Sequence, residues 1–138
     1  IAHGGQPDIL ARLAAGEALG THLLPVINKL EARKRYILSG SRPASAAGEI
    51  EVDAGAARAL ARGGSLLPAG MVRVNGEFGR GDTVRVVVAG GRALAVGLAG
   101  YASADLARLC GRRSTEIEAV LGYTFGDEVI HRNDMVLL

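Results

Sequence analysis

The sequence is poor in residues that form cross-links or aromatic contacts. Cys110 is its one cysteine, so no disulfide can form within the chain. Tryptophan is absent and only 4% of the residues are aromatic, so we expect a core of Val, Leu, Ile and Ala. We interpret Cys110, on a predicted helix face, as a buried thiol rather than a reactive one.

Long hydrophobic runs and an excess of one charge are also missing. No apolar run reaches the roughly 18–20 residues that a membrane span needs, and no signal-peptide pattern is present. We therefore expect a cytoplasmic chain with no membrane partner. The 16 basic and 14 acidic residues give a formal net charge of +2, far from a strong nucleic-acid signature. The pI near 9.0 nevertheless permits binding to nucleic acid.

The first 28 residues contain an amphipathic segment without a partner. Pro7 and Asp8 are predicted to begin a helix that Gly16 ends, and a short strand is predicted in "THLLP". The apolar face of this helix comprises Ile9, Leu10, Leu13 and Ala14. Because a lone helix and strand cannot bury both faces, and because the chain begins with Ile1 rather than methionine, we expect a piece of a longer protein.

Residues 29–47 are predicted to connect this segment to the rest. A dense basic run opens the connector and comprises Lys29, Arg33, Lys34 and Arg35. Ser, Pro, Gly and Ala then dominate from Ser39 to Gly48, which is typical of a linker. We interpret the basic run as a solvated helix, with contact to phosphates as the alternative.

From residue 48 onward the pattern changes to short strands and tight turns. Gly90 and Gly91 predict a hairpin, because both residues can take positive φ. Period-two spacing predicts buried strand faces built by Ile50 and Val52, by Val72 and Val74, and by Val84, Val86 and Val88. These features predict a mainly β fold with short helices, arranged as a compact barrel-like sheet.

Capping residues mark the short helices of this region. Asp53 is predicted to cap the first helix, with Gly63 or Gly64 as its left-handed stop. Thr115 and Glu118 stand at capping-box spacing before a later helix. The segment "DEVIHRNDMVLL" is predicted to form two strands joined by a turn, with the final "MVLL" closing the sheet.

Motifs for catalysis are weak. The glycines of "NGEFGRGD" invite a phosphate-loop interpretation, but a valine-rich strand follows where a helix is needed, so we interpret them as turn glycines. His3, His22 and His131 stand far apart and have no neighbouring Cys or carboxylate cluster. We predict no catalytic, cofactor-binding or metal-binding residue in this chain.

Several stretches resemble known families. "VDAGAARAL", "GGSLLPAGM" and "GRGDTVRV" resemble the PUA domain, the pseudo-barrel of pseudouridine synthases and archaeosine transglycosylases. The flanks "LEARKRYILSG" and "STEIEAVLGYTFGDEVIHRNDMVLL" resemble those of the same domain in bacterial glutamate 5-kinases. "GGQPDILARLAAGEALGTHLLP" is similar to the last helix and strand of the amino acid kinase domain of those enzymes.

This resemblance implies a PUA-like pseudo-barrel preceded by a helix–strand remnant of an α/β kinase domain. The implied division is a kinase-domain remnant at 1–28, a basic connector and linker at 29–47, a PUA domain at 48–122, and strands packing on the barrel at 123–138. The partners that it implies are the missing amino acid kinase domain, a second copy of the chain in a homo-oligomer, and RNA.

Glutamate 5-kinases transfer the γ-phosphate of ATP to L-glutamate with Mg²⁺, in the first step of proline synthesis, and proline typically inhibits them. The resemblance implies that ATP and Mg²⁺ bind the whole enzyme ahead of Ile1. No cofactor is expected in these residues, which would be inactive alone and accessory or regulatory in the enzyme.

Two alternatives to this role stay open. One is the RNA-binding PUA module of an RNA-modifying enzyme, because in such domains the first helix and the glycine turn after it line the RNA groove. The corresponding residues here are Arg58, Arg62, Gly63, Gly64 and Arg73. The other is a purely architectural role, in which Leu66, Leu67 and residues 135–138 pack on the sheet or on a partner.

Overall fold

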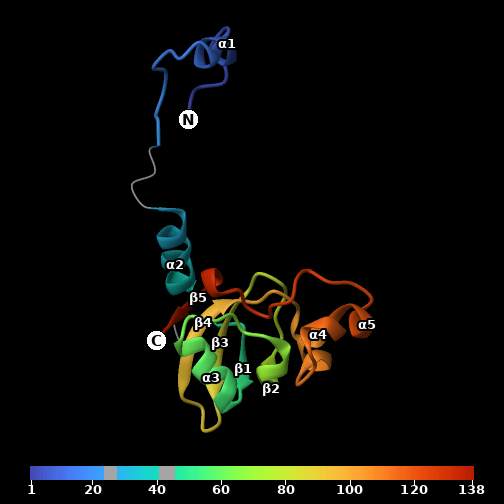
Figure 1. The fold of residues 1–138 in the computed structure, drawn as a ribbon. Helices are drawn as coiled ribbons and strands as arrows, with labels where there is room; N and C mark the ends of the chain where they lie inside the picture. Colours follow the sequence, from blue (N-terminus) through green and yellow to red (C-terminus); the bar gives the residue numbers. More distant parts are fainter. Residues whose placement is uncertain (24–27, 41–45) are drawn as a thin grey trace.

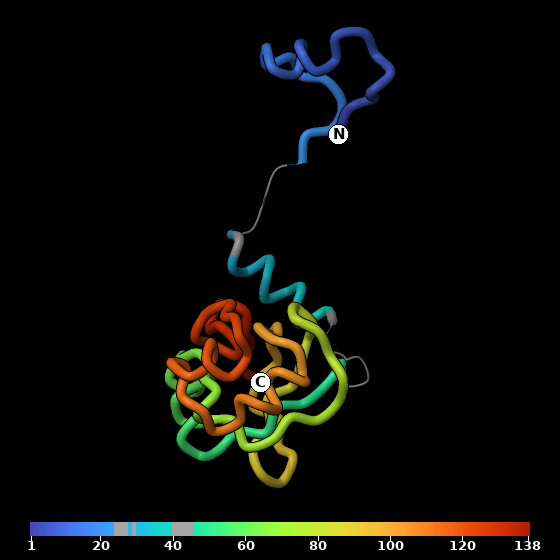
Figure 2. Tube along the Cα trace, turned by 90° about the vertical axis from the view of Figure 1, so that its right-hand side faces the viewer, coloured from blue at the N-terminus to red at the C-terminus, as the bar shows by residue number. Residues whose placement is uncertain are grey.

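The computed structural model describes residues 1–23, 28–40 and 46–138. Two helices come first, α1 (Ile9–Ala14) and α2 (Lys29–Gly40). Residues 48–138, which we call the β unit, follow them. Figures 1 and 2 show α1 apart from the β unit, whereas α2 lies against it.

A single twisted sheet organises the described residues of the β unit (Figure 1). Its strands run in the order β2-β1-β3-β4-β5. The central pair β1–β3 is parallel and the other neighbouring pairs are antiparallel. The strands are β1 (Gly48–Val52), β2 (Met71–Gly76), β3 (Thr83–Val88), β4 (Ala93–Leu98) and β5 (Met135–Leu137). A mainly β fold with short helices, predicted from the alternating pattern, is thereby confirmed.

Short helices join these strands and cover the sheet. The α-helices are α3 (Ala54–Ala61), α4 (Ser103–Leu109) and α5 (Ile117–Leu121). Single turns of 3₁₀ helix are η1 (Pro68–Gly70), η2 (Ser114–Glu116) and η3 (Arg132–Asp134). Because α3, η1 and β2 separate β1 from β3, the chain has the crossover that a parallel pair requires.

One continuous apolar core lies between the sheet and these helices. Val84 and Val86 from β3 are fully buried, as are Leu106 and Leu109 from α4. Tyr101 is the largest buried side chain, and its hydroxyl donates a hydrogen bond of 2.5 Å to the carbonyl oxygen of Gly126. That bond satisfies the one polar atom of a side chain that is otherwise buried for its apolar ring.

Two irregularities in the sheet overturn part of the predicted alternation. Opposite β1, the pairing passes from Val52–Met71 to Glu51–Arg73 and skips Val72. Val72 is therefore 55% exposed, and Met71 enters the core in its place. This is the geometry of a β-bulge, in which one strand carries an extra residue.

The second irregularity lies at the end of β3, where the register shifts between Val86 and Val87. Val87 is consequently buried, whereas Val88 is only partly buried. The hairpin that follows agrees with the prediction, since Gly90 and Gly91 have φ values of 93° and 79°. Period-two spacing thus predicted the position of this strand correctly, but it placed Val88 rather than Val87 on the buried face at the strand's end.

The helix caps were predicted with mixed success. The Asp53 carboxylate accepts a hydrogen bond of 2.7 Å from the backbone N–H of Ala56, as predicted. Before α5, however, Glu116 accepts the capping bond, from the backbone N–H of Arg113 at 2.8 Å. The predicted box of Thr115 and Glu118 is wrong because a turn of 3₁₀ helix comes first and moves the start of α5.

The two ends of the chain also differ from expectation. At the start, Asp8 precedes α1 at φ 56° and its side chain caps nothing. Residues 21–23 form no strand, and the rest of the strand predicted there lies outside the described residues. At the other end, η3 and β5 replace the two predicted strands, although Ile130 makes an isolated bridge with Leu66.

Candidate nucleic-acid interface

The predicted groove begins at the carboxyl end of α3. Leu60 is 1% exposed and holds the helix against the core, whereas Arg58 and Arg62 are exposed. Gly63 then takes φ 83°, a conformation that costs glycine no steric penalty. The backbone N–H of Gly63 donates to the carbonyl oxygen of Leu60 at 2.8 Å, and that of Gly64 donates to Ala59 at 3.0 Å. This turn ends the helix.

The glycine turn lines a cavity of about 330 Å³ together with α2, η3 and β5. Lys34 comes from α2 and Arg132 from η3, and both are exposed. The rest of the lining is apolar and consists of Leu60, Met135, Val136 and Leu137. The cavity therefore has an apolar floor with two cations on its rim.

A second cavity, of about 360 Å³, continues this surface beyond Leu60 and Leu137, which line both. Arg58 and Arg92 line it. We call the two cavities together the basic groove. Four basic side chains line the groove, those of Lys34, Arg58, Arg92 and Arg132. Over the described ranges, no carboxylate lies within 4.0 Å of the cationic group of any of them. Four uncompensated cations around an apolar floor favour a ligand with several negative charges.

The structure brings together only some of the residues predicted for RNA contact. Gly63 and Gly64 line the first cavity and Arg58 the second, whereas Arg62 lines neither although it precedes the glycine turn. Arg73 lies on β2, at the opposite edge of the sheet from β5. Their role in binding stays a prediction.

Sequence reasoning missed three lining residues of the basic groove. Lys34 stood in a basic run that we interpreted as solvated, and Arg92 was one of several scattered arginines. Arg132 carried no local signal at all, since only the fold places η3 beside α2 and the glycine turn.

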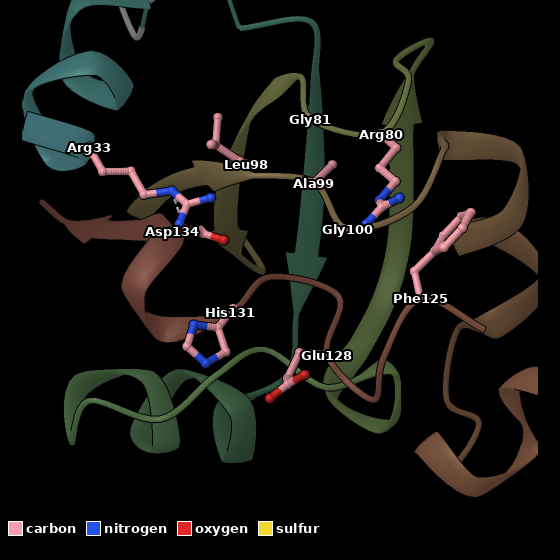
Figure 3. Close-up of a pocket in the computed structure, with 10 residues that line it drawn as sticks. All are labelled: Arg33, Arg80, Gly81, Leu98, Ala99, Gly100, Phe125, Glu128, His131 and Asp134. Carbon is pink, nitrogen blue, oxygen red and sulfur yellow. Dashed lines mark ion pairs between the residues drawn. The ribbon is translucent and has the colours of Figure 1, made fainter. Parts of the chain in front are cut away.

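A further cavity, of about 270 Å³, lies on the other side of η3 (Figure 3). Its two guanidinium groups are already engaged. The Nε atom of Arg33 is 2.6 Å from Oδ1 of Asp134, and Arg80 lies 4.0 Å from the centre of the Phe125 ring. Figure 3 shows these two pairs on opposite sides of the cavity. Because its cations have partners, this cavity is a poorer anion site than the basic groove.

The described residues do not fit ATP with Mg²⁺. No three His, Cys, Asp or Glu side chains gather there as metal ligands. The glycines at 76, 79 and 81 lead into β3, so no helix amino terminus faces them. We therefore derive no phosphoryl-transfer step from this part of the chain.

Two pKa shifts are resolved, and both groups lie outside the basic groove. A hydrogen bond to Asp105 raises the pKa of the Tyr123 phenol, and burial raises the pKa of the Cys110 thiol. Across the described ranges, no helix has the length and apolar character to cross a bilayer.

Comparison with known proteins places the chain in a family. The chain is 50% identical to the glutamate 5-kinase of Herpetosiphon aurantiacus, over 99% of its own length and 36% of that protein. It is 51% identical to the enzyme of Deinococcus radiodurans, over 100% of its length and 37% of that protein. The chain thus spans a little over a third of these curated relatives, and the predicted resemblance is confirmed.

Among solved structures, a PUA domain from Aeropyrum pernix K1, determined as a tartrate complex, is 31% identical. It has a TM-score of 0.46 and covers 62% of this chain and 41% of its own. The family model described as PUA domain matches residues 48–121, more than half of the chain. The chain therefore belongs to the PUA-domain family, within a stretch that is similar along its whole length to glutamate 5-kinases.

Proposed function

We propose that this chain is the carboxy-terminal part of a glutamate 5-kinase. The observation that carries the proposal is the extent of the similarity, which reaches across 99–100% of the chain. The PUA model accounts only for residues 48–121. A PUA module borrowed by an RNA-modifying enzyme would share that region but not the residues ahead of it. The whole enzyme uses ATP and Mg²⁺ to phosphorylate the γ-carboxylate of L-glutamate.

Within such an enzyme the role of this part is accessory. Phosphoryl transfer depends on positioning the reactants and on cations around the transferring group. The described residues offer no such arrangement, so the reacting groups belong to the rest of the enzyme. The exposed apolar side chains Leu10 and Leu13 of α1 are suited to contact that preceding part.

The proposal is tested with three proteins: the whole enzyme, residues 1–138 alone, and the whole enzyme lacking residues 48–138. The assay follows ADP release that depends on L-glutamate. We expect turnover from the whole enzyme and from the truncated enzyme, and none from residues 1–138. Turnover by residues 1–138 alone would contradict the accessory role. A whole enzyme that does not phosphorylate glutamate would overturn the kinase assignment.

The basic groove favours a second function, binding of RNA through its phosphates. Arg132 and Lys34 on the rim have no carboxylate partner in the described part of the chain, and the floor between them is apolar. Phosphate contacts of this kind release counterions, so affinity falls steeply with salt.

This function is tested by salt titration with a fluorescein-labelled single-stranded RNA. We expect Arg132→Ala to weaken binding and to reduce the slope of log affinity against log salt by about 0.7, the value for one contact to a single strand. Arg113→Ala is the matched control, since it removes the same charge from an exposed residue that lines neither cavity of the basic groove. A flat salt response of the unmodified chain would reject RNA binding, and equal effects of both variants would reject the basic groove as the site.

A further inference from the structure

Helix α2 is docked on the β unit by one apolar and one charged contact. Ile37 is fully buried, and α2 packs against β4, β5 and η3. One turn earlier on the same face, the Nε atom of Arg33 lies 2.6 Å from Oδ1 of Asp134 in η3. Figure 3 shows the Arg33 side chain extending from α2 to Asp134. The helix is therefore fixed to the segment that also presents Arg132.

This docking places consecutive residues of α2 on the two sides of η3. Arg33 lines the cavity of Figure 3, whereas Lys34 lines the basic groove with Arg132, Gly63 and Gly64. Lys34 can occupy that position only while Ile37 stays buried, because the two residues lie three positions apart in the same helix. The first cavity of the basic groove is thus complete only in the docked arrangement.

We propose that α2 completes the RNA site, so that RNA binding and docking of α2 are coupled. The proposal rests on the RNA-binding function proposed above. An RNA phosphate held between Lys34 and Arg132 bridges α2 and η3 and adds to the contacts made by Ile37 and Arg33. By linkage, docking raises RNA affinity by the same factor by which RNA favours docking. The connector ahead of the PUA domain then responds to what the domain binds.

Substitution of Asp134 distinguishes coupling between RNA binding and α2 docking from a simple change in charge. Asp134 is an acidic residue two positions after Arg132, so neutralising it removes a charge that repels RNA. Electrostatics alone therefore predicts that Asp134→Asn tightens RNA binding. Coupling predicts the opposite, because the substitution removes the ionic partner of Arg33 and loosens α2.

The experiment measures the binding of residues 1–138 to a fluorescein-labelled oligouridylate over a range of salt. Lys34→Ala is expected to weaken binding several-fold and to lower the salt slope by about 0.7. Arg35→Ala is the matched control, because it removes the same charge from the same helix at an exposed residue that lines neither cavity of the groove. Asp134→Asn is expected to weaken binding without changing the contact at Lys34 directly.

Equal effects of Lys34→Ala and Arg35→Ala, with a steep slope in the unmodified chain, would overturn the role of α2 and leave RNA binding standing. A flat slope in the unmodified chain would reject both proposals. Tighter binding by Asp134→Asn would overturn the coupling.

Hydrogen exchange of the unmodified chain gives a test that does not depend on the folding of a variant. Coupling predicts that RNA slows exchange of the α2 amides, and unchanged exchange at saturating RNA would overturn it.

Discussion

Leu106 in α4 and Leu10 in α1 both lie on short helices, yet their surroundings are opposite. Leu106 is fully buried between α4 and the sheet, whereas Leu10 is 79% exposed. The β unit buries a continuous core of its own, while the amino-terminal segment leaves Leu10, Leu13 and Leu23 at its surface. An apolar helix face therefore shows that a partner is required, but not that the same chain supplies it.

The largest difference between the two regions is expected from leucine truncation. Leu106→Ala removes a fully buried side chain and should lower the free energy of unfolding by about 2–5 kcal/mol, through lost burial and a new cavity. Leu10→Ala should change it by less than about 0.5 kcal/mol, because the side chain already faces solvent. Urea denaturation of residues 1–138 measures both. Equal losses would show that α1 packs on the β unit.

Glycine-to-alanine substitutions compare the β unit with the amino-terminal segment again, with a smaller expected loss of stability. A Cβ atom at Gly97 in β4 would lie 2.7 Å from Cγ2 of Ile130 and 2.9 Å from the carbonyl oxygen of Asp134. Gly97→Ala should therefore cost about 1–3 kcal/mol, the usual range for overpacking. Gly4→Ala is the control, since nothing lies within 4 Å of its Cβ position. Thermal unfolding should separate the two variants, and a neutral Gly97→Ala would mean that β4 and η3 are not closely packed.

Helix caps give the next contrast. The Asp53 side chain accepts a bond from Ala56, whereas the Asp8 side chain caps nothing at the start of α1. Asp53→Ala should thus lower the free energy of unfolding by about 1 kcal/mol, and Asp8→Ala should leave it nearly unchanged. Urea midpoints of the paired variants check this. A larger effect at Asp8 would contradict the described start of α1.

The sequence alone predicted the strands better than their inward faces. Period two located β2 and β3, but a bulge changes backbone geometry without any signature in residue type. Val72 is as hydrophobic as Val74, and only its lack of a partner opposite β1 turns it outward. The cap at Glu116 was missed for a related reason, because the 3₁₀ turn before α5 decides which carboxylate reaches the free N–H groups.

The candidate site was predicted where its determinants are local. The turn at Gly63 follows from α3 and from the conformational freedom of glycine, so the predicted left-handed stop is confirmed, while its contact with RNA stays a prediction. Lys34 and Arg132 meet only because Ile37 docks α2 beside η3. A single buried isoleucine in a charged helix gives no periodic signal, so this contact could not be foreseen from the residue pattern.

The smallest expected difference concerns thiol chemistry. Burial raises the pKa of the Cys110 thiol above that of an exposed cysteine, so at pH 8 less of it is thiolate. The matched reference is Leu23→Cys in a Cys110→Ala background, which puts a thiol at a site where the native side chain is 71% exposed. We expect Cys110 to react several-fold more slowly with Ellman's reagent.

The raised pKa of Cys110 also predicts how the stability of the fold changes with pH. The folded chain holds the Cys110 proton more tightly than the unfolded chain, so the stability contributed by the protonated thiol is fully present below the pKa of the unfolded thiol. This stability is lost as the pH rises through the raised pKa of the folded thiol. Cys110→Ala should therefore lose less stability than the native chain over that alkaline range. Identical alkaline slopes, or equal thiol rates at the two positions, would place Cys110 in surroundings as open as those of the amino-terminal segment.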